Sequence, residues 1–543
     1  ASPDRYARAL EVVAKDPNTD GVLVILTPQA MSDPSRTADK LKAHGTTAGK
    51  PVLASWMGGD EVAAGESILN RAGIPAFPYP DTAARAFNDM WRYSKSLRSL
   101  YETPALAGGE DGGADRAGAE DLIASVLASG RTLLTEAESK QLLELYRIST
   151  VPTRVATTEE QAVALAAELG YPIVLKVHSQ TITHKTDVGG VELNLSNAEA
   201  VRHAYRAIEQ SIRQCVGAEH FLGVTVQPMI KLNGYELILG CSPDLQFGPM
   251  LVFGAGGPLP ELLDRSLGLP PLNTTLARRM MEHTRIFHAL QGIRGRRPAD
   301  LGALERLLVR FSGLVVEQPR IKEIDINPLL ATPDRLIALD ARVILHGADV
   351  DADRLPRPAI RPYPTQYVAP WTAANGLTVT IRPIRPEDEP LVVRLHEKLS
   401  EDSVYLRFFQ SLKLSRRIAH ERLTRVCFLD YNREMALVAD FKDPETGDHE
   451  IIAMGRLSRL YGNDEAEFSL EVRDAFQRHG LGTELLRRLV AIGRDEQMGC
   501  ISAVVLPQNL GMLRICEKLG FHTHYAEADR LIRARLGLVD TGK

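Results

Sequence analysis

The sequence predicts an α/β protein built from several domains. Its 543 residues exceed what one hydrophobic core supports, so roughly three or four domains are expected. Continuous apolar runs such as 21–26 alternate with helix-like segments, which is typical of sheets covered by helices. Two stretches have the composition of linkers, the Gly-rich run 108–113 and the Pro-rich run 351–370. They divide the chain into three folded blocks.

The first block, 1–106, places buried-strand runs at 21–26 and 51–56 between helix-like segments. Strands that are apolar throughout predict a parallel sheet with both faces covered. A Gly-rich linker is expected at 107–129.

The second block, 130–345, opens with the capping-box residues Thr135 and Glu138, which predict a helix through Leu145. It then mixes helices with strands. The expected strands are 173–177, 224–228, 235–240 and 250–254.

The third block, 376–543, follows a Pro-rich linker at 346–375. Strands are expected at 378–384, 435–441, 450–460, 465–472 and 501–506. Between the last two lies the segment 477–483, with Gly480 and Gly482 before a helix-like run from Glu484. Glycines let the backbone approach an anion, and the helix start offers unpaired N–H groups. This turn therefore predicts a site for a diphosphate-bearing cofactor.

The order of these elements resembles the GNAT acetyltransferase superfamily. The superfamily's Gln-x-x-Gly-x-Gly is present at Gln477, Gly480 and Gly482, and Asn509 precedes Leu-Gly-Phe at 519–521. The resemblance implies acetyl-CoA as cofactor, with its pyrophosphate on the amides of 478–483. The implied cofactor-binding residues are Leu470, Val472, Gln477, Arg478, His479, Gly480, Leu481, Gly482, Thr483 and Asn509.

The attacking amine of a lysine has an ordinary pKa near 10.4, so its reaction requires a base. Period-2 alternation places Glu467, Ser469 and Glu471 on one face of their strand. By resemblance Glu467 is the general base, and Glu471 is structural or faces the substrate. Two residues depart from the superfamily pattern. Cys516 stands where a tyrosine acid is common, and Asp474 replaces the usual proline.

The second block resembles the ATP-grasp domain of ADP-forming acyl-CoA synthetases, through Lys176, the segment 184–191, the glycines at 254–257 and the segment 323–329. The resemblance implies that His184 relays a phosphoryl group and that Asn327 and Asp340 bind Mg²⁺. It implies that the nucleotide site contains Lys176, Gln227, Met229, Glu236, Gly256 and Gly257. ATP binding and an active ATP-grasp domain are left open.

The first block resembles the second flavodoxin-like subdomain of the same synthetases, notably at 56–59 and 73–77. Two further domains precede it in that family, so the chain is expected to be incomplete at its N-terminus. A synthetase-like region joined to a GNAT domain resembles Pat-type protein lysine acetyltransferases. The segments 403–409 and 430–438 are also similar to that group.

The favoured function is therefore transfer of acetyl from acetyl-CoA to a protein lysine by direct attack, with the synthetase-like region as a regulatory module. An acyl-CoA synthetase is a target by analogy with the family. The alternatives are ADP-forming acyl-CoA synthesis through His184, and a nucleotide or CoA sensor without catalysis. The sequence leaves open a homo-oligomer and association with upstream synthetase domains.

Composition excludes other classes of partner. The net charge is −5 with both signs interspersed, which gives no reason to expect nucleic acid or a membrane surface. No apolar run approaches the ~20 residues that span a bilayer. The five cysteines lack paired or metal-like spacing, which predicts reduced thiols in a cytoplasmic protein.

Overall fold

A computed structural model of the protein describes residues 2–29, 32–44, 50–103, 113–182, 184–231, 233–256, 264–292, 295, 297–444, 446–460 and 464–538. The chain forms two compact units, Ala1–Glu102 and Thr103–Lys543.

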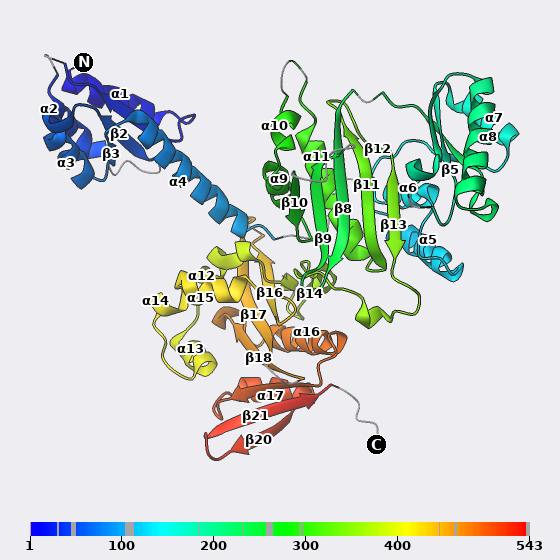
Figure 1. Ribbon diagram of the computed structural model, residues 1–543. Helices are drawn as coiled ribbons and strands as arrows, with labels where there is room; N and C mark the ends of the chain where they lie inside the picture. Colours follow the sequence, from blue (N-terminus) through cyan, green and yellow to red (C-terminus); the bar gives the residue numbers. More distant parts are fainter. Residues whose placement is uncertain are drawn as a thin grey trace. The chain divides into compact units, whose positions relative to one another are not determined.

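The first unit is a three-stranded parallel sheet in the order β1-β2-β3, covered by helices (Figure 1). Strand β2 is buried along its whole length, and the Trp56 side chain at its end is fully buried in the core. Burial on both faces accounts for the unbroken apolar run of β2, whereas Ile25 on the edge strand β1 is 44% exposed. The elements are α1 Pro3–Lys15, β1 Val22–Leu26, α2 Pro34–Leu41, β2 Val52–Trp56, α3 Ala63–Arg71, β3 Ala76–Phe77 and α4 Pro80–Leu100.

The second block contains two sheets. One has the order β4-β7-β5-β6, and the other has the order β10-β9-β8-β11-β12 with β13 paired to β11. The predicted capping box is present, because the Thr135 and Glu138 side chains each accept from the other residue's backbone. Its helices are α5 Arg116–Ala128, α6 Glu136–Leu145, α7 Glu159–Leu169, α8 Ala198–Cys215, α9 Thr274–Glu282, α10 Ile286–Leu290 and α11 Leu301–Glu317. Helix α5 lies in the stretch 107–129 predicted as a linker, which corrects that prediction, because Ala119, Ile123 and Val126 pack in the core of this block. Its strands are β4 Arg154–Ala156, β5 Ile173–Val177, β6 Val191–Leu195, β7 Val224–Pro228, β8 Tyr235–Asp244, β9 Gly248–Ala255, β10 Arg265–Gly268, β11 Ile321–Ala331, β12 Leu336–Ala338 and β13 Ala341–Leu345.

The third block is built on a sheet in the order β14-β15-β16-β17-β18-β19-β21-β20. Alternate residues of its strands pack on opposite faces: Leu437 packs with α16, whereas Val438 packs with α12 and α15. Figure 1 shows the yellow helices on one side of β17 and α16 on the other. Its helices are α12 Glu389–Glu397, α13 Glu401–Phe408, α14 Leu414–Arg417, α15 His420–Cys427, α16 Leu481–Asp495 and α17 Leu510–Lys518. Its strands are β14 Ala369–Thr372, β15 Thr378–Pro383, β16 Glu434–Lys442, β17 His449–Arg459, β18 Glu465–Val472, β19 Cys500–Val505, β20 His522–Ala526 and β21 Leu531–Gly537.

Part of the stretch 346–375, predicted as a linker, belongs to the sheet of the third block. Strand β14 pairs antiparallel with β15, and Tyr363 is 2% exposed in the core of this block. The Tyr363 hydroxyl donates to the Pro383 carbonyl at 2.8 Å. Proline-rich composition suits an edge strand as well as a spacer, and only packing distinguishes the two.

Among the helices that the structure describes, none is long and apolar enough to cross a membrane.

Candidate active site

The sheet of the third block opens between β18 and β19. In the described register these parallel strands pair from Glu465 to Glu467, opposite Cys500 to Ser502. Strand β18 continues to Val472 and β19 to Val505 without further pairing in that register. The backbone groups on this edge of β18 beyond Glu467 can therefore bind a ligand lying between the strands.

The predicted anion-binding turn follows β18 and leads into α16. Gly480 precedes the helix with a φ of +88°, a conformation that favours glycine. Arg478 is also left-handed, at φ +65°. A Cβ on Gly482 would lie 3.3 Å from Ile515 and 3.7 Å from Val472, so a side chain there would crowd the opening. Both glycines of the motif thus have a structural reason.

Gln477 and Asp474 fix this turn to its surroundings. The Gln477 amide donates to the Val472 carbonyl and to the Ser403 hydroxyl, both at 3.0 Å. The Asp474 carboxylate accepts from the Ser400 backbone at 2.9 Å and from the Ser400 and Ser403 hydroxyls at 2.7 and 2.8 Å. Burial opposes ionisation, but these hydrogen bonds outweigh it and hold the pKa of Asp474 below its ordinary value. Asp474, a departure from the superfamily pattern, therefore anchors the start of α13.

A cavity of about 980 Å³ lies in the opening. Two of the predicted cofactor-binding residues do not line it. His479 hydrogen-bonds Asn375 at 3.0 Å, and Leu481 is 1% exposed in the core. Asn509 caps α17 by accepting from Met512 at 3.1 Å. The predicted residues that line the cavity are Glu467, Leu470, Val472, Gln477, Arg478, Gly480, Gly482, Thr483 and Asn509.

Glu467 presents an exposed carboxylate to this cavity. It pairs with Ser458 on β17 and Ser502 on β19, at the position where the two parallel strands separate. None of the ion pairs found among the described residues involves Glu467. Glu471, which also lines the cavity, is in contrast 8% exposed. Of the two carboxylates, Glu467 has the solvent access that proton transfer requires.

Cys516 does not replace the tyrosine acid of related domains. Its side chain is fully buried, and it is not among the residues that line the cavity. Burial raises the pKa of its thiol to about 11. Proton transfer by this thiol would require contact with the cavity. Cys516 is therefore a core residue.

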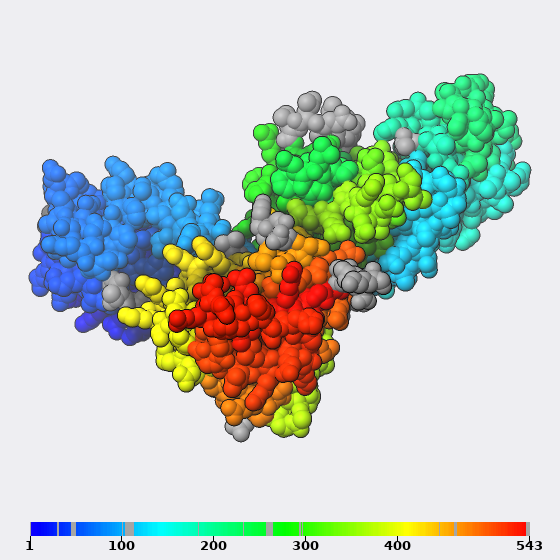
Figure 2. All heavy atoms as spheres, turned by 90° about the horizontal axis from the view of Figure 1, so that it is seen from below, coloured from blue at the N-terminus to red at the C-terminus, as the bar shows by residue number. Residues whose placement is uncertain are grey.

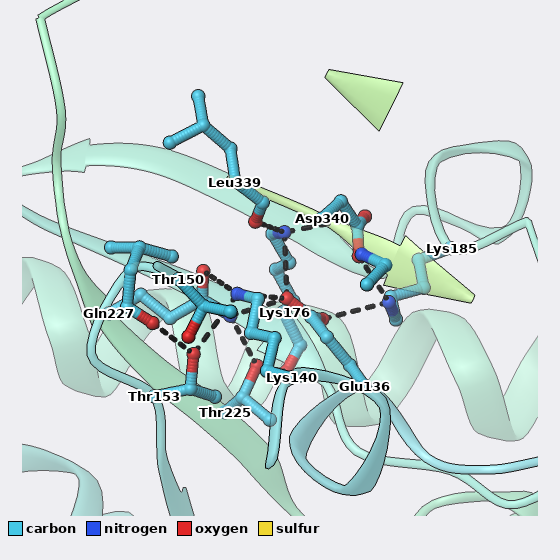
Figure 3. A network of polar contacts seen from close by, with 12 residues as sticks. Glu136, Lys140, Thr150, Thr153, Lys176, Lys185, Thr225, Gln227, Leu339 and Asp340 are labelled. Carbon is cyan, nitrogen blue, oxygen red and sulfur yellow. Dashed lines mark hydrogen bonds and ion pairs between the residues drawn. The ribbon is translucent and has the colours of Figure 1, made fainter. Parts of the chain in front are cut away.

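In the second block, three lysines surround one buried carboxylate (Figure 3). Glu136 is 2% exposed on its side chain, and it binds Lys140, Lys176 and Lys185 at 2.8, 2.9 and 2.8 Å. Burial alone would raise the pKa of Glu136, but the three ammonium groups hold it well below its usual range. Asp340 adds contacts at 3.4 Å to Lys176 and 3.5 Å to Lys185.

The pKa values of Lys140 and Lys176 shift in opposite directions. Burial lowers the pKa of Lys140 to about 8, although Glu136 opposes the change. Burial acts on Lys176 as well, but Glu136 and Asp340 outweigh it and raise its pKa. Lys176 thus stays charged near Asp340, as a phosphate-binding role requires.

The other described residues predicted for the nucleotide site lie on, or directly after, β7 of one sheet and β8 and β9 of the other. The Gln227 amide donates to Glu136 at 2.7 Å and is buried, and the Met229 N–H donates to Pro172 at 2.9 Å. The Glu236 carbonyl accepts from Gly256 at 2.8 Å. A Cβ on Gly256 would lie 2.9 Å from the Leu237 backbone, which explains the glycine. Gly257 lies outside the described residues.

The predicted metal ligand Asn327 is on β11, two residues beyond Asp325. His184 and Asn327 are exposed, and both His184 and Asp340 influence the Asp325 carboxyl. Burial raises the pKa of Asp325, and the nearby Asp340 adds to the rise against Arg342. No group of three or more His, Cys, Asp or Glu side chains with metal-ligand geometry occurs in the described part of the chain. Magnesium binding by Asn327 and Asp340 stays a prediction.

Sequence reasoning missed Glu136, Lys140 and Lys185. Glu136 and Lys140 stand four residues apart on α6, and such a pair is ordinarily a solvated surface contact. The capping box fixes where α6 starts, so it also fixes which face of the helix carries Glu136. The capping box and the four-residue spacing were visible in the sequence. The burial that makes the ion pair important depends on tertiary packing.

Known families match the two larger blocks. A model described as an ATP-grasp domain matches residues 125–345, and one described as an acetyltransferase (GNAT) domain matches residues 378–522. The fold is therefore a multidomain α/β assembly of a parallel three-stranded sheet, an ATP-grasp region and a GNAT domain, as predicted.

Two relatives show the family of the ATP-grasp region. The beta subunit of the ADP-forming acetate–CoA ligase I of Pyrococcus furiosus is 41% identical over 228 residues, which are 42% of this chain and 97% of the relative. The chain belongs to this family of ADP-forming acyl-CoA synthetases through its ATP-grasp region, and it also carries a GNAT domain. ADP-forming acetate–CoA ligase I of Archaeoglobus fulgidus is 36% identical over 346 residues, 64% of this chain and 49% of the relative. The chain thus spans about half the length of that relative.

A solved structure also resembles the third block. The GNAT domain of S. lividans PAT is 28% identical and covers 32% of this chain and 99% of its own, with a TM-score of 0.29.

Proposed function

We propose that the protein transfers acetyl from acetyl-CoA to the ε-amine of a protein lysine, with Glu467 as the general base. The observation that carries the proposal is the exposed Glu467 carboxylate in a cavity that also borders the glycine turn of α16. The residues present fit acetyl-CoA. The left-handed Gly480 and the small Gly482 leave room beside a helix start that favours a pyrophosphate.

Each part of this site has one chemical task. A lysine amine is about 99.9% protonated at neutral pH, and Glu467 takes its proton. The amine nitrogen bonds to the acetyl carbon, the carbon–sulfur bond breaks, and CoA leaves as a thiolate. The second proton that the nitrogen loses on becoming an amide passes to solvent. Backbone N–H groups on the open edge of β18, near Leu470 and Val472, stabilise the negative charge that develops on the carbonyl oxygen. The thiolate needs no dedicated acid, consistent with the buried Cys516.

Glu467→Gln tests the proposal. We expect acetyl-dependent release of CoA, with a lysine-containing protein as acceptor, to fall about 10²- to 10⁴-fold in the variant while acetyl-CoA binding is retained. Glu465→Gln is the matched control. Glu465 is on the same face of β18 but does not line the cavity, and it lies 3.7 Å from Arg535. Equal rates for the parent and the Glu467 variant, or equal losses in both variants, would exclude Glu467 as the base.

The acceptor and the partner rest on family resemblance. The proposed acceptor is a lysine of a protein, an acyl-CoA synthetase being one such target, because a synthetase-like region is joined to the GNAT domain in this chain. Acetylation of a purified synthetase, compared with free lysine and polyamines at equal amine concentration, tests this choice. Faster turnover of the small amines would contradict it.

A second candidate function is nucleotide binding by the ATP-grasp region, either for ADP-forming acyl-CoA synthesis or for control of acetyl transfer. The three lysines around Glu136 and Asp340 leave one positive charge in excess, which fits a phosphate. ADP release with ATP, acetate and CoA would support synthesis. His184→Ala should abolish that release, whereas His203→Ala, on the exposed face of α8, should not. Nucleotide binding that changes the acetylation rate without ADP release would support control.

A further inference from the structure

A second, smaller cavity lies beside the acyl-transfer cavity and shares three of its lining residues. It has a volume of about 40 Å³, room for one small polar group. Arg407, Ser469 and Glu471 line both cavities. Figure 2 shows the yellow and orange segments, which supply these side chains, in one continuous body. The remaining lining residues are His396, Phe408, Arg422, Val426, Met454 and Arg456.

Four buried polar atoms in this small cavity lack a hydrogen-bond partner in the described structure. They are Nδ1 of His396, Nε of Arg422, Nε of Arg456 and Oε2 of Glu471. His396 is 2% exposed and Glu471 is 8% exposed. Buried polar atoms without partners are rare in native proteins. The Nε groups of Arg422 and Arg456 are donors that an acceptor group of a ligand would satisfy, whereas Oε2 of Glu471 is itself an acceptor.

The charges around the cavity do not balance. Arg456 pairs with Glu434, and Arg417 lies 4.0 Å from Glu401 while its Nη1 donates to the His396 carbonyl. Arg407 donates to the Ser469 hydroxyl at 2.7 Å, and Arg422 stacks at 4.8 Å on Phe408.

Of the described groups that line this cavity or bind its arginines, the three arginines Arg407, Arg422 and Arg456 thus face two carboxylates, those of Glu434 and Glu471. One positive charge is in excess, so a single anion would complete the balance. Burial lowers the pKa of Arg422, and the nearby Arg407, Arg456 and Arg417 lower it further against Glu471. Burial also lowers the pKa of His396, so this imidazole is neutral near pH 7.

We propose that the small cavity is a carboxylate subsite that receives the far end of an acyl group, so that the enzyme accepts acyl-CoA donors bearing a terminal carboxylate, of the malonyl or succinyl class. The inference rests on the proposed acyl transfer and adds the donor class. The Nε groups of Arg422 and Arg456 supply charged donors, and Arg407 lies between this subsite and the acyl-transfer cavity. The bonds made and broken, and the proton taken by Glu467, are those of acetyl transfer.

The test compares kcat/KM for succinyl-CoA and malonyl-CoA with kcat/KM for acetyl-CoA, using one protein acceptor. In the parent we expect kcat/KM for succinyl-CoA or malonyl-CoA to be at least as high as kcat/KM for acetyl-CoA. Arg422→Gln should lower the ratio of succinyl to acetyl turnover about 10- to 100-fold, because it removes a charged donor. Arg425→Gln, one helical turn away on the exposed face of α15, should leave the ratio unchanged.

Binding and free-anion measurements separate the outcomes. The subsite is overturned if the parent transfers acetyl but Arg422→Gln leaves the ratio of succinyl to acetyl turnover unchanged. If no donor supports transfer, the proposed function fails, and the binding affinities measured by calorimetry then test the subsite. Tighter binding of succinyl-CoA than of acetyl-CoA, abolished by Arg422→Gln, supports the subsite. Equal affinities for the two donors overturn it. Free acetate that stimulates the parent but not the Arg422 variant, without donor discrimination, identifies a free anion as the ligand and overturns the acyl assignment.

Discussion

Replacing Glu136 with glutamine tests whether one buried carboxylate organises the lysine cluster of the ATP-grasp region. The carboxylate binds three ammonium groups at 2.8–2.9 Å and the Gln227 amide at 2.7 Å. Glutamine keeps the volume but removes the charge. Breaking a buried ion pair costs about 3–5 kcal/mol. Burial already lowers the pKa of Lys140 to about 8, and loss of its proton relieves part of the repulsion, so we expect about 3 kcal/mol.

Hydrogen exchange followed by mass spectrometry measures this loss in the intact chain. A local destabilisation of about 3 kcal/mol corresponds to exchange roughly 150-fold faster in the peptides that cover α6, β5 and β7. Peptides from β16 and β17 serve as the internal reference. Glu160→Gln, on the exposed face of α7, is the matched control. Exchange that rises no more in the Glu136 variant than in this control would refute the reasoning.

The pH dependence has a defined sign. Because the folded-state pKa of Glu136 lies well below the ordinary carboxyl value, its contribution to stability is complete above that ordinary value. The contribution is lost as the pH falls through the folded-state pKa. The contribution of Glu136 ionisation to the stability of the parent should therefore be constant from about pH 5 to 7 and shrink only in acid.

Three further substitutions test the acetyltransferase domain. Gly480→Ala places a side chain on a left-handed residue, which costs about 1–2 kcal/mol, and should raise the KM for acetyl-CoA about tenfold. Gly520→Ala is the control: Gly520 has a φ of +83° but lies outside the cavity, so this change should lower only thermal stability. Asp474→Ala should free the Ser400 end of α13 and speed its hydrogen exchange about tenfold; unchanged exchange would show that α13 is held by other contacts. Cys516→Ala should keep the shape of the pH–rate profile between pH 6 and 9, since burial raises the thiol pKa to about 11; loss of a limb near pH 8.5 would make Cys516 an acid.

Local patterns predicted the strands that frame the site closely. The expected strand 465–472 is β18 without change, and the expected strand 378–384 is β15 to within one residue. The glycine turn was predictable because a left-handed backbone and a close approach restrict residue type at Gly480 and Gly482. Glu467 followed from strand alternation and family resemblance, and its role stays a prediction.

The sequence by itself determined the order of the elements, the motif residues and the family, because these depend on local periodicity and residue type. Only the tertiary structure decided which charges are buried together. Glu136 and Lys185 are 49 positions apart in the chain, as are Arg407 and Arg456, and no local pattern links such residues. Their importance arises from shared desolvation, which depends on how separate elements pack. The same holds for the Pro-rich stretch, where burial of Tyr363 turns part of a predicted linker into part of a domain.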